Sequence, residues 1–205
     1  MGLYDDHILP RGIAWSMGGK KFSEHRERAL RGVSGRVLEL GFGAGNNLPH
    51  YPSVVTAVLA LEPARVNRKL ARKRIARSRA PVEWVGLRGE EIPLEDSSVD
   101  AVTSTWTLCT IPDLSQALRE VMRVLRPGGA FHFVEHGLSP EPSVAKWQRR
   151  LNPLSKRFGG GCHLDRAIDA LIREAGFTLA ELEHPTLSGP RFVSYLYRGV
   201  AVPAG

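Results

Sequence analysis

The chain has 205 residues, of which 42% are hydrophobic and 24% charged, so it is long enough to form one globular domain with its own core. Its mean hydropathy is −0.18, and no run approaches the roughly 18 apolar residues of a membrane-spanning helix. The first residues are acidic and precede no apolar stretch, which excludes a secretory signal. Two cysteines are too few for a disulfide framework, and the absence of a CxxC pair excludes a zinc knuckle. We therefore expect a reduced, cytoplasmic protein.

The net charge of +7 comes from one segment. Residues 65–79 contain eight basic residues and no acid, and the remaining 20 bases nearly balance the 21 acids. A basic helix of this kind is typical of a solvated surface, an RNA-binding face or a peripheral contact with anionic lipids. Val66, Leu70 and Ile75 are expected on its buried side, and no RNA-binding motif accompanies it. A solvated face is the simplest interpretation, and membrane contact comes second.

Short apolar segments alternate with helical ones along the chain. A loose amino-terminal arm precedes a helix expected over residues 20–32. Asp113 and Gln116 are an N-cap acid and a residue able to complete a capping box before a later helix, which ends at a turn over 126–129. Strands are expected over 36–40, 57–61, 82–85, 99–104, 130–134, 177–182 and 192–200, and the other helices over 65–79, 117–125 and 165–175.

Strands that alternate with helices of about ten residues predict a mostly parallel sheet covered on both faces. Only residues 183–191 separate the last two strands, so the final strand must be antiparallel to its neighbour. The predicted fold is a single α/β domain with a doubly wound, Rossmann-like sheet of seven strands whose last strand is antiparallel. Residues 1–32 are expected to form an arm and a helix that cap the active site of the domain over 33–205.

A glycine-rich turn follows the first strand. Gly41, Gly43 and Gly45 come at or just after the end of this strand, where a strand-to-helix turn presents free backbone amides to a polar ligand. The spacing GxGxG departs from the GxGxxG fingerprint because residue 46 is Asn, which disfavours an NAD-dependent dehydrogenase. No Lys-Ser/Thr pair follows, so a phosphate-binding P-loop is excluded.

Glu62 ends the second strand, 17 residues after Gly45. In a wound sheet this position places a carboxylate beside the ribose hydroxyls of a bound nucleoside. The glycine turn and Glu62 together predict a cofactor that contains a nucleoside.

With these motifs the chain resembles the class I S-adenosylmethionine-dependent methyltransferases. The segments that carry the resemblance are 37–45, 61–63, 89–94 with 98–100, and 124–129. It implies methyl transfer from S-adenosylmethionine, with S-adenosylhomocysteine as product. By position, Glu39 and Gly41 would hold the methionine part of the cofactor and Glu62 the ribose. The other implied cofactor contacts are Gly43, Gly45, Pro63, Thr105 and, at the adenine edge, Gly89 and Glu90.

A narrower resemblance, to the alkyl-thiol methyltransferases and their bacterial relatives, implies a small-molecule thiol as acceptor. The segments that carry it are 4–10, 107–110, 134–136 and 160–166. Hydroxyl, amine and quinone-ring carbon acceptors stay open.

Two histidines are the catalytic candidates. Methyl transfer needs an aligned acceptor in a dry site, and an oxygen, nitrogen or sulfur acceptor must also lose a proton. His136 comes directly after the fifth strand, and His163 precedes a predicted helix. A hydrogen-bonded structural histidine is the alternative for each.

Six residues are expected in the acceptor site: Tyr4, His7, Trp106, Cys109, Cys162 and Arg166. Core packing is the alternative for Trp106 and Cys109, and an ordinary surface position for Tyr4 and His7. A Cys109–Cys162 disulfide is disfavoured in a reducing compartment. No Asp, His or Glu cluster has the spacing of a metal site, so no metal is expected.

Two other classes of function stay open. A non-catalytic cofactor-binding module would interact through the basic helix, although the retained glycines, Glu39 and Glu62 argue against a decayed site. An RNA methyltransferase would bind phosphates through residues 65–79, with an affinity that falls steeply with salt. The sequence indicates no oligomeric state.

Overall fold

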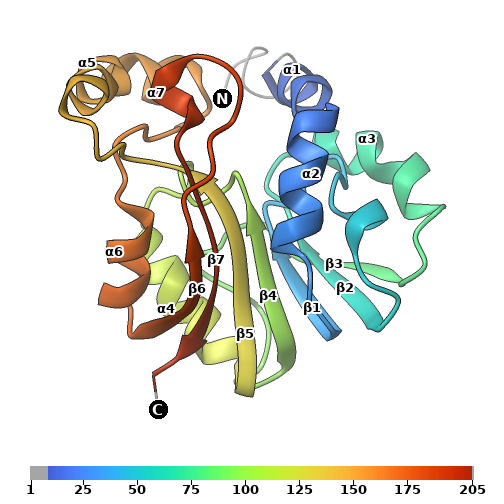
Figure 1. Ribbon diagram of the computed structural model, residues 1–205. Helices are drawn as coiled ribbons and strands as arrows, with labels where there is room; N and C mark the ends of the chain where they lie inside the picture. Colours follow the sequence, from blue (N-terminus) through green and yellow to red (C-terminus); the bar gives the residue numbers. More distant parts are fainter. Residues whose placement is uncertain (1–8, 205) are drawn as a thin grey trace.

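The computed structural model describes residues 9–204, so the predictions for Tyr4 and His7 lie outside the described part. These residues form a sheet of seven strands in the order β3-β2-β1-β4-β5-β7-β6, with helices on both faces (Figure 1). The strands are β1 (Gly35–Leu40), β2 (Val55–Leu61), β3 (Val82–Gly86), β4 (Val99–Thr105), β5 (Leu125–His136), β6 (Phe177–Glu183) and β7 (Leu196–Pro203). The helices are α1 (Leu9–Ser16), α2 (Lys20–Ala29), the short η2 (Leu48–His50), α3 (Arg65–Ile75), α4 (Leu114–Val124), α5 (Pro142–Phe158), α6 (Ile168–Glu174) and α7 (Arg191–Ser194).

The sheet has the predicted topology. β1 pairs in parallel with both β2 and β4, whereas β7 lies antiparallel between β5 and β6. The wound α/β fold with a reversed last strand is therefore confirmed. The strand order reverses at β1, because β2 and β3 lie on one side of it and β4 and β5 on the other. At such a switch point the loops after the strands diverge and leave a crevice for a ligand.

Alternate residues of the central strands face two separate cores. Leu38 and Leu59 belong to the core covered by α4 and α6, whereas Val37 and Val58 belong to the core that Ala71 of α3 completes. Because both faces of the sheet are covered, these strands appear in the sequence as continuous apolar runs rather than alternating ones.

Several helix boundaries differ from the predictions. α2 and α3 end earlier than expected, and α4 begins at Leu114 because Asp113 caps it, accepting a hydrogen bond from Gln116 N at 2.9 Å. α6 begins only at Ile168, since Asp165 is engaged elsewhere: it accepts a hydrogen bond of 2.7 Å from Asn152 Nδ2. The residues predicted to extend α2, α3 and α6 thus take part in the connecting loops.

β5 begins at Leu125 rather than at the predicted Ala130. Leu125 pairs with Val99 of β4, and the register shifts immediately afterwards. Arg126 adds an ion pair of 2.5 Å with Asp100. The turn over 126–129 is therefore an irregularity within the strand, not a gap before it.

Four helical segments were not predicted: α1, the short η2, α5 and α7. α5 has 17 residues and buries only Val144, Ala145 and Gln148. Its apolar residues recur at helical spacing (144, 147, 151, 154 and 158), but Pro153 interrupts the pattern, and proline usually ends or kinks a helix. α7 occupies the start of the strand expected over 192–200, which begins at Leu196 instead.

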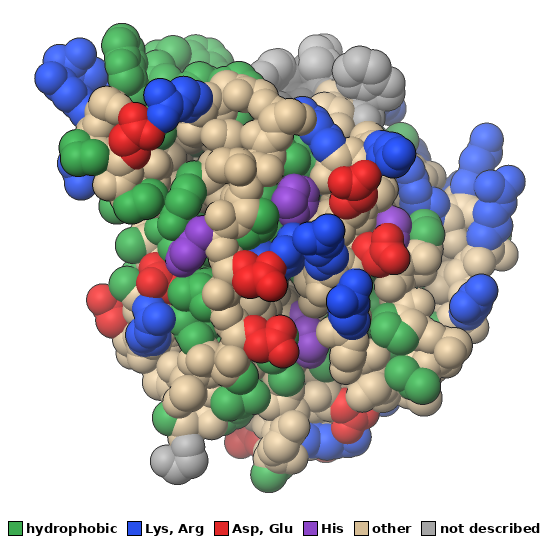
Figure 2. All heavy atoms as spheres, viewed as in Figure 1, with side chains coloured by type: hydrophobic (Ala, Val, Ile, Leu, Met, Phe, Trp, Pro, Cys, Tyr) green, Lys and Arg blue, Asp and Glu red, His purple; other side chains and the backbone are tan. Residues whose placement is uncertain are grey.

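The surface of α5 combines apolar and basic side chains. Trp147, Leu154 and Phe158 are 57%, 61% and 54% exposed, and Figure 2 shows hydrophobic and basic side chains next to each other over this helix, at upper left. Within residues 9–204, no helix is long and apolar enough to cross a bilayer.

The basic stretch over 65–79 contributes partly to the fold. Arg68 stacks on Trp84, with 4.8 Å between guanidinium and ring centroid, and Arg74 donates to the Ala44 carbonyl at 3.0 Å. The other six bases of the stretch are exposed. Contact with RNA or a membrane through this face stays a prediction.

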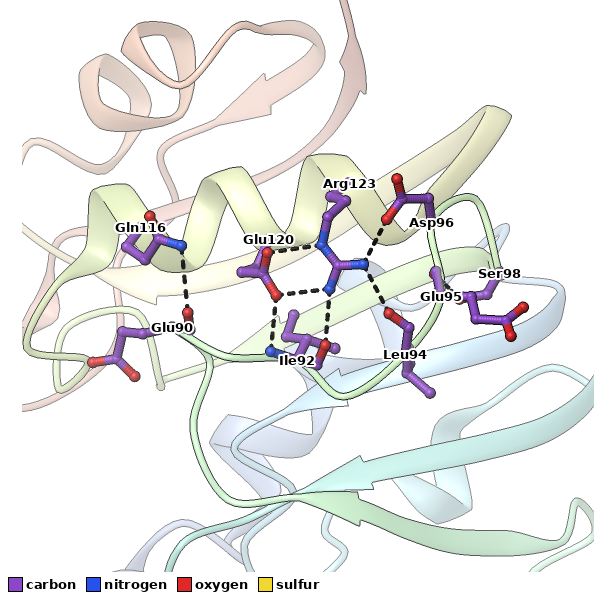
Figure 3. A network of polar contacts seen from close by, with 9 residues as sticks. All are labelled: Glu90, Ile92, Leu94, Glu95, Asp96, Ser98, Gln116, Glu120 and Arg123. Atoms are coloured by element: carbon purple, nitrogen blue, oxygen red, sulfur yellow. Dashed lines mark hydrogen bonds and ion pairs between the residues drawn. The ribbon is translucent and has the colours of Figure 1, made fainter.

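Arg123 fastens the loop between β3 and β4 onto α4 (Figure 3). Its guanidinium donates to the Ile92 and Leu94 carbonyls, both at 2.8 Å, and binds Glu120 through Nε at 2.8 Å and Nη2 at 2.7 Å. Glu120 in turn accepts a hydrogen bond from Ile92 N at 2.9 Å. The clamp therefore fixes the loop that carries residues 89–90.

We expect Arg123→Met to lower the free energy of unfolding by about 1–3 kcal/mol, because two backbone carbonyls and the Glu120 carboxylate lose a charged donor. Arg119→Met is the matched control, since Arg119 is exposed and bonds to the Gln116 side chain of its own helix. Its effect should stay below about 0.5 kcal/mol. Urea unfolding measures both, and equal losses would contradict the clamp.

Candidate functional site

A pocket of about 280 Å³ lies at the carboxyl ends of β1, β2 and β4. The strand ends contribute Glu39, Glu62 and Thr105, while α1 and the turn after α5 contribute further lining. Figure 1 shows α1 and α5 at the same end of the sheet. The pocket therefore occupies the crevice that the switch point leaves.

The turn after β1 is built on left-handed glycines. The backbone angle φ is +65° at Gly41, +56° at Gly43 and +74° at Gly45. A Cβ at Gly41 would collide with the Thr107 side chain, whereas a Cβ at Gly43 would have the Gly41 carbonyl oxygen 3.9 Å away as its neighbour. Because Gly43 also lines the pocket, its missing side chain leaves room for a ligand against the backbone.

Glu62 ties this glycine turn to the start of α3. Its Oε2 accepts a hydrogen bond from Gly43 N at 2.7 Å, and its Oε1 accepts from Ala64 N at 2.8 Å and Asn67 Nδ2 at 3.1 Å. A carboxylate can accept about four hydrogen bonds. Glu62 therefore keeps capacity for a hydroxyl group of a ligand in the pocket.

Glu39 is a buried carboxylate in the pocket lining. It accepts hydrogen bonds from Asn47 Nδ2 at 2.9 Å and from the Tyr51 hydroxyl at 2.8 Å. Burial raises the pKa of Glu39 to about 8, although the Tyr51 hydrogen bond and the Arg26 charge lower it. The sequence predicted Glu39 but neither of its two partners. Asn47 could have been predicted as a partner from its position in the sequence, directly after the glycine turn.

Arg26 of α2 meets Trp106, the residue after β4, in the pocket lining. The guanidinium lies 4.7 Å from the Trp106 ring centroid, and the Arg26 Nε is buried with no hydrogen-bond partner within residues 9–204. Trp106 has a φ of +54°, a left-handed conformation that costs a residue with a side chain about 1–2 kcal/mol. Strain of this kind persists mainly where function needs it. Trp106 was predicted from the sequence, whereas Arg26 was not.

Glu135 organises the turn after β4. Its Oε1 accepts hydrogen bonds from Thr107 N at 2.8 Å, Leu108 N at 3.0 Å and Ser104 Oγ at 2.9 Å. Burial raises the pKa of Glu135 to about 7, against the effect of these bonds. Thr107 lines the pocket, so Glu135 positions part of its wall.

Cys109, His136 and Cys162 converge beside this turn. Their sulfur and ring-nitrogen atoms all lie within 4.8 Å of one another, and His136 Nε2 is 3.1 Å from Cys162 Sγ. The contacts with Cys109 and with His136 lower the pKa of the Cys162 thiol. His163 lies next to the cluster, because its backbone N and its Nδ1 both contact the Cys109 carbonyl, at 2.8 and 3.1 Å. Both cysteines are free thiols.

The structure divides the predicted site residues into two groups. Those that line the pocket are Glu39, Gly41, Gly43, Glu62, Pro63, Thr105 and Trp106. Those outside its lining are Gly45, Gly89, Glu90, Cys109, His136, Cys162, His163 and Arg166. Arg166 donates to the Leu108 and Ile111 carbonyls, so it holds the turn after β4 rather than facing the pocket.

Comparison with known proteins places this site in a family. A family model described as a methyltransferase domain matches residues 38–133. The chain is 39% identical to the thiol S-methyltransferase TMT1B of Rattus norvegicus over 160 residues, which cover 75% of this chain and 65% of that protein. It is 37% identical to the thiol S-methyltransferase TMT1A of Homo sapiens over 178 residues, which cover 82% and 71%. The chain thus spans about two thirds of the length of these relatives.

Solved structures agree on the fold. A SAM-dependent methyltransferase from Methanosarcina mazei superposes with a TM-score of 0.67 over 82% of this chain and 92% of that one, at 19% identity. At this level of identity the likeness shows the architecture alone.

The raised pKa of Glu39 makes stability depend on pH. The folded protein keeps a proton that the unfolded chain releases above a pKa of 4.5, so stability should fall as pH rises from about 5 to about 8, by at most about 1.4 kcal/mol per pH unit. Glu39→Gln cannot ionise at this position, so its free energy of unfolding should fall less steeply with pH, by up to that slope. Urea unfolding across this range measures the difference. Glu95→Gln, at an exposed carboxylate, should leave the wild-type slope unchanged, and parallel profiles for Glu39→Gln would reject the assignment.

Proposed function

Because this chain belongs to the S-adenosylmethionine-dependent methyltransferases, we propose that it transfers the methyl group of S-adenosylmethionine to the sulfur of a small-molecule thiol. The observation that carries the transferase part is the glycine turn bonded to Glu62 at the switch point of the sheet. The named activity of the rat and human relatives supports a sulfur acceptor.

The pocket residues fit the groups of this cofactor. Two buried polar atoms in the lining, Arg26 Nε and Asn67 Oδ1, have no partner among the described residues and are available to a ligand. Arg26 would bind the carboxylate of the methionine part, Glu39 its ammonium group and Glu62 the ribose hydroxyls. When bound, S-adenosylmethionine supplies a methyl group already activated by its positively charged sulfur.

The role of the protein is to bind the cofactor and the acceptor, to orient them toward each other and to exclude water from the pocket. Ile13, Ala14 and Met17 bring apolar surface from the amino-terminal segment, and Gly159 with Gly160 lines the pocket after α5. This arrangement supports a capping role for residues 1–32. It also favours a small apolar acceptor, because the polar groups of the lining have roles in holding the cofactor.

The described pocket lining provides no histidine or cysteine to remove the proton of the acceptor thiol. A thiol reacts as its thiolate, so this proton has to be removed. The predicted base His136 belongs to the neighbouring cluster and His163 lies next to that cluster, beside the turn that contributes Thr107 to the pocket. Deprotonation of the acceptor therefore requires a contact between the acceptor and that cluster.

Cofactor binding can be tested with two matched glycine variants. Gly43→Val places a side chain into the pocket, whereas Gly128→Val carries similar left-handed strain, with φ of +80°, in open space at the irregular start of β5. We expect calorimetric titration to show S-adenosylmethionine binding at least about tenfold weaker for Gly43→Val, a loss of about 1.4 kcal/mol. Gly128→Val should bind as the wild type does. Absence of binding to folded wild-type protein would sink the transferase assignment.

The acceptor can be tested by competition between matched alkyl compounds. We expect methylation of an alkyl thiol and none of the alcohol or amine of the same chain length, measured by mass spectrometry of the product. A simple quinol belongs in the same panel. Methylation of the quinol but not the thiol would replace sulfur by carbon or oxygen as the acceptor atom and leave the cofactor assignment intact.

A further inference from the structure

The cysteine–histidine cluster of Cys109, His136 and Cys162 has the composition of a metal site. Its three ligand atoms lie within 4.8 Å of one another and come from three separate segments: the turn after β4, the end of β5 and the turn after α5. The backbone on both sides is tied down. His163 N donates to the Cys109 carbonyl at 2.8 Å, and Cys162 N donates to the Gly159 carbonyl at 3.3 Å.

Zinc is the ion that suits these ligands. Thiolate sulfur binds zinc at about 2.3 Å and imidazole nitrogen at about 2.0–2.1 Å, so neighbouring ligands of a tetrahedral ion lie about 3.5 Å apart. Small side-chain adjustments bring the cluster to this spacing, since His136 Nε2 and Cys162 Sγ are already 3.1 Å apart. Soft thiolate ligands also select zinc over magnesium or calcium. Two cysteines and one histidine leave a fourth position open, as in zinc sites that bind a substrate.

We propose that Cys109, His136 and Cys162 bind a zinc ion and that the sulfur of the acceptor thiol completes its coordination; the second half rests on the proposed function. The thiol loses its proton to solvent when its sulfur bonds to zinc, and the bound sulfur stays a thiolate at neutral pH. The ion thereby supplies the deprotonation for which the pocket lining has no group.

The position of the cluster fits this role. The turn that carries Cys109 also contributes Thr107 and Thr110 to the pocket, and the turn that carries Cys162 contributes Gly159 and Gly160. Both turns form walls of the cofactor pocket, so the proposed ion lies beside the pocket that would hold the methyl donor. His136 would bind the ion through Nε2, because this is the ring atom that faces Cys162 Sγ, at 3.1 Å.

The first test measures metal, independently of methyl transfer. The full chain, purified with a thiol-free phosphine reductant and loaded with zinc, is dialysed and its zinc content measured by mass spectrometry. We expect about one ion per chain, and with cobalt in place of zinc the sulfur-to-cobalt charge-transfer absorption of thiolate ligands. Cys162→Ser and Cys109→Ser should lose most of both signals. His184→Gln, at an exposed histidine stacked on Tyr195, is the control that should keep them.

Folding of each variant is checked by circular dichroism, and the half-buried Cys162 provides a substitution that disturbs the core less than one at the buried Cys109. Wild-type protein that binds no zinc, or a folded Cys162→Ser that binds as much as the wild type, would overturn the site. Formation of a Cys109–Cys162 disulfide in place of metal binding would overturn it as well.

The second test addresses the acceptor. Titration of an alkyl thiol into the cobalt-loaded chain should change the charge-transfer spectrum, whereas the thioether of the same chain length should not. Bound metal with no spectral response to the thiol would overturn the acceptor half. Neither measurement uses S-adenosylmethionine, so failure of the proposed function would show separately, as absent cofactor binding in the calorimetric experiment.

Discussion

Two buried carboxylates at strand ends hold the functional end of the sheet together. Glu62 follows β2 but binds the turn after the neighbouring β1, through Gly43 N. Glu135 lies at the end of β5 but binds the turn after the neighbouring β4, through the backbone amides of Thr107 and Leu108. A hydrogen bond to a charged acceptor contributes about 1.5–3 kcal/mol. The turns that form the pocket are thus fixed by adjacent strands, and the pocket assembles with the sheet itself.

Most of the fold could be predicted because strand composition and connection length decide it. Strands buried on both faces, such as the one containing Val37 and Leu38, appear as short apolar runs, and the brief connection before β7 requires an antiparallel strand. α5 escaped prediction because Pro153 interrupts its apolar repeat, and proline usually ends or kinks a helix. Much of that repeat, including Trp147 and Leu154, stays exposed. Helix ends were misplaced where side chains such as Asp165 form loop contacts that no local pattern reveals.

The site was predictable where function imposes a local pattern and not where it depends on tertiary contact. Left-handed glycines and the strand-end Glu62 are visible in the sequence because backbone geometry demands them at fixed spacing. Arg26 reaches the pocket from a helix whose sequence gives no such sign. Cys109, His136 and Cys162 are separated by 27 and 26 residues, and only the pairing of β4 with β5 and the return of the chain after α5 bring them together. Spacing along the chain could not show a metal-ligand set of this kind.

The turn over 107–110 joins the cofactor pocket to the cysteine–histidine cluster. Thr107 and Thr110 line the pocket, while Cys109 between them belongs to the cluster. Glu135 holds the amides at the start of the turn, and Arg166 and His163 bind the carbonyl groups of Leu108 and Cys109. Because these contacts fix both sides of one short turn, the two sites keep a constant separation. Transfer between two bound groups needs this rigidity, since a misplacement of about 1 Å costs about 100-fold in rate.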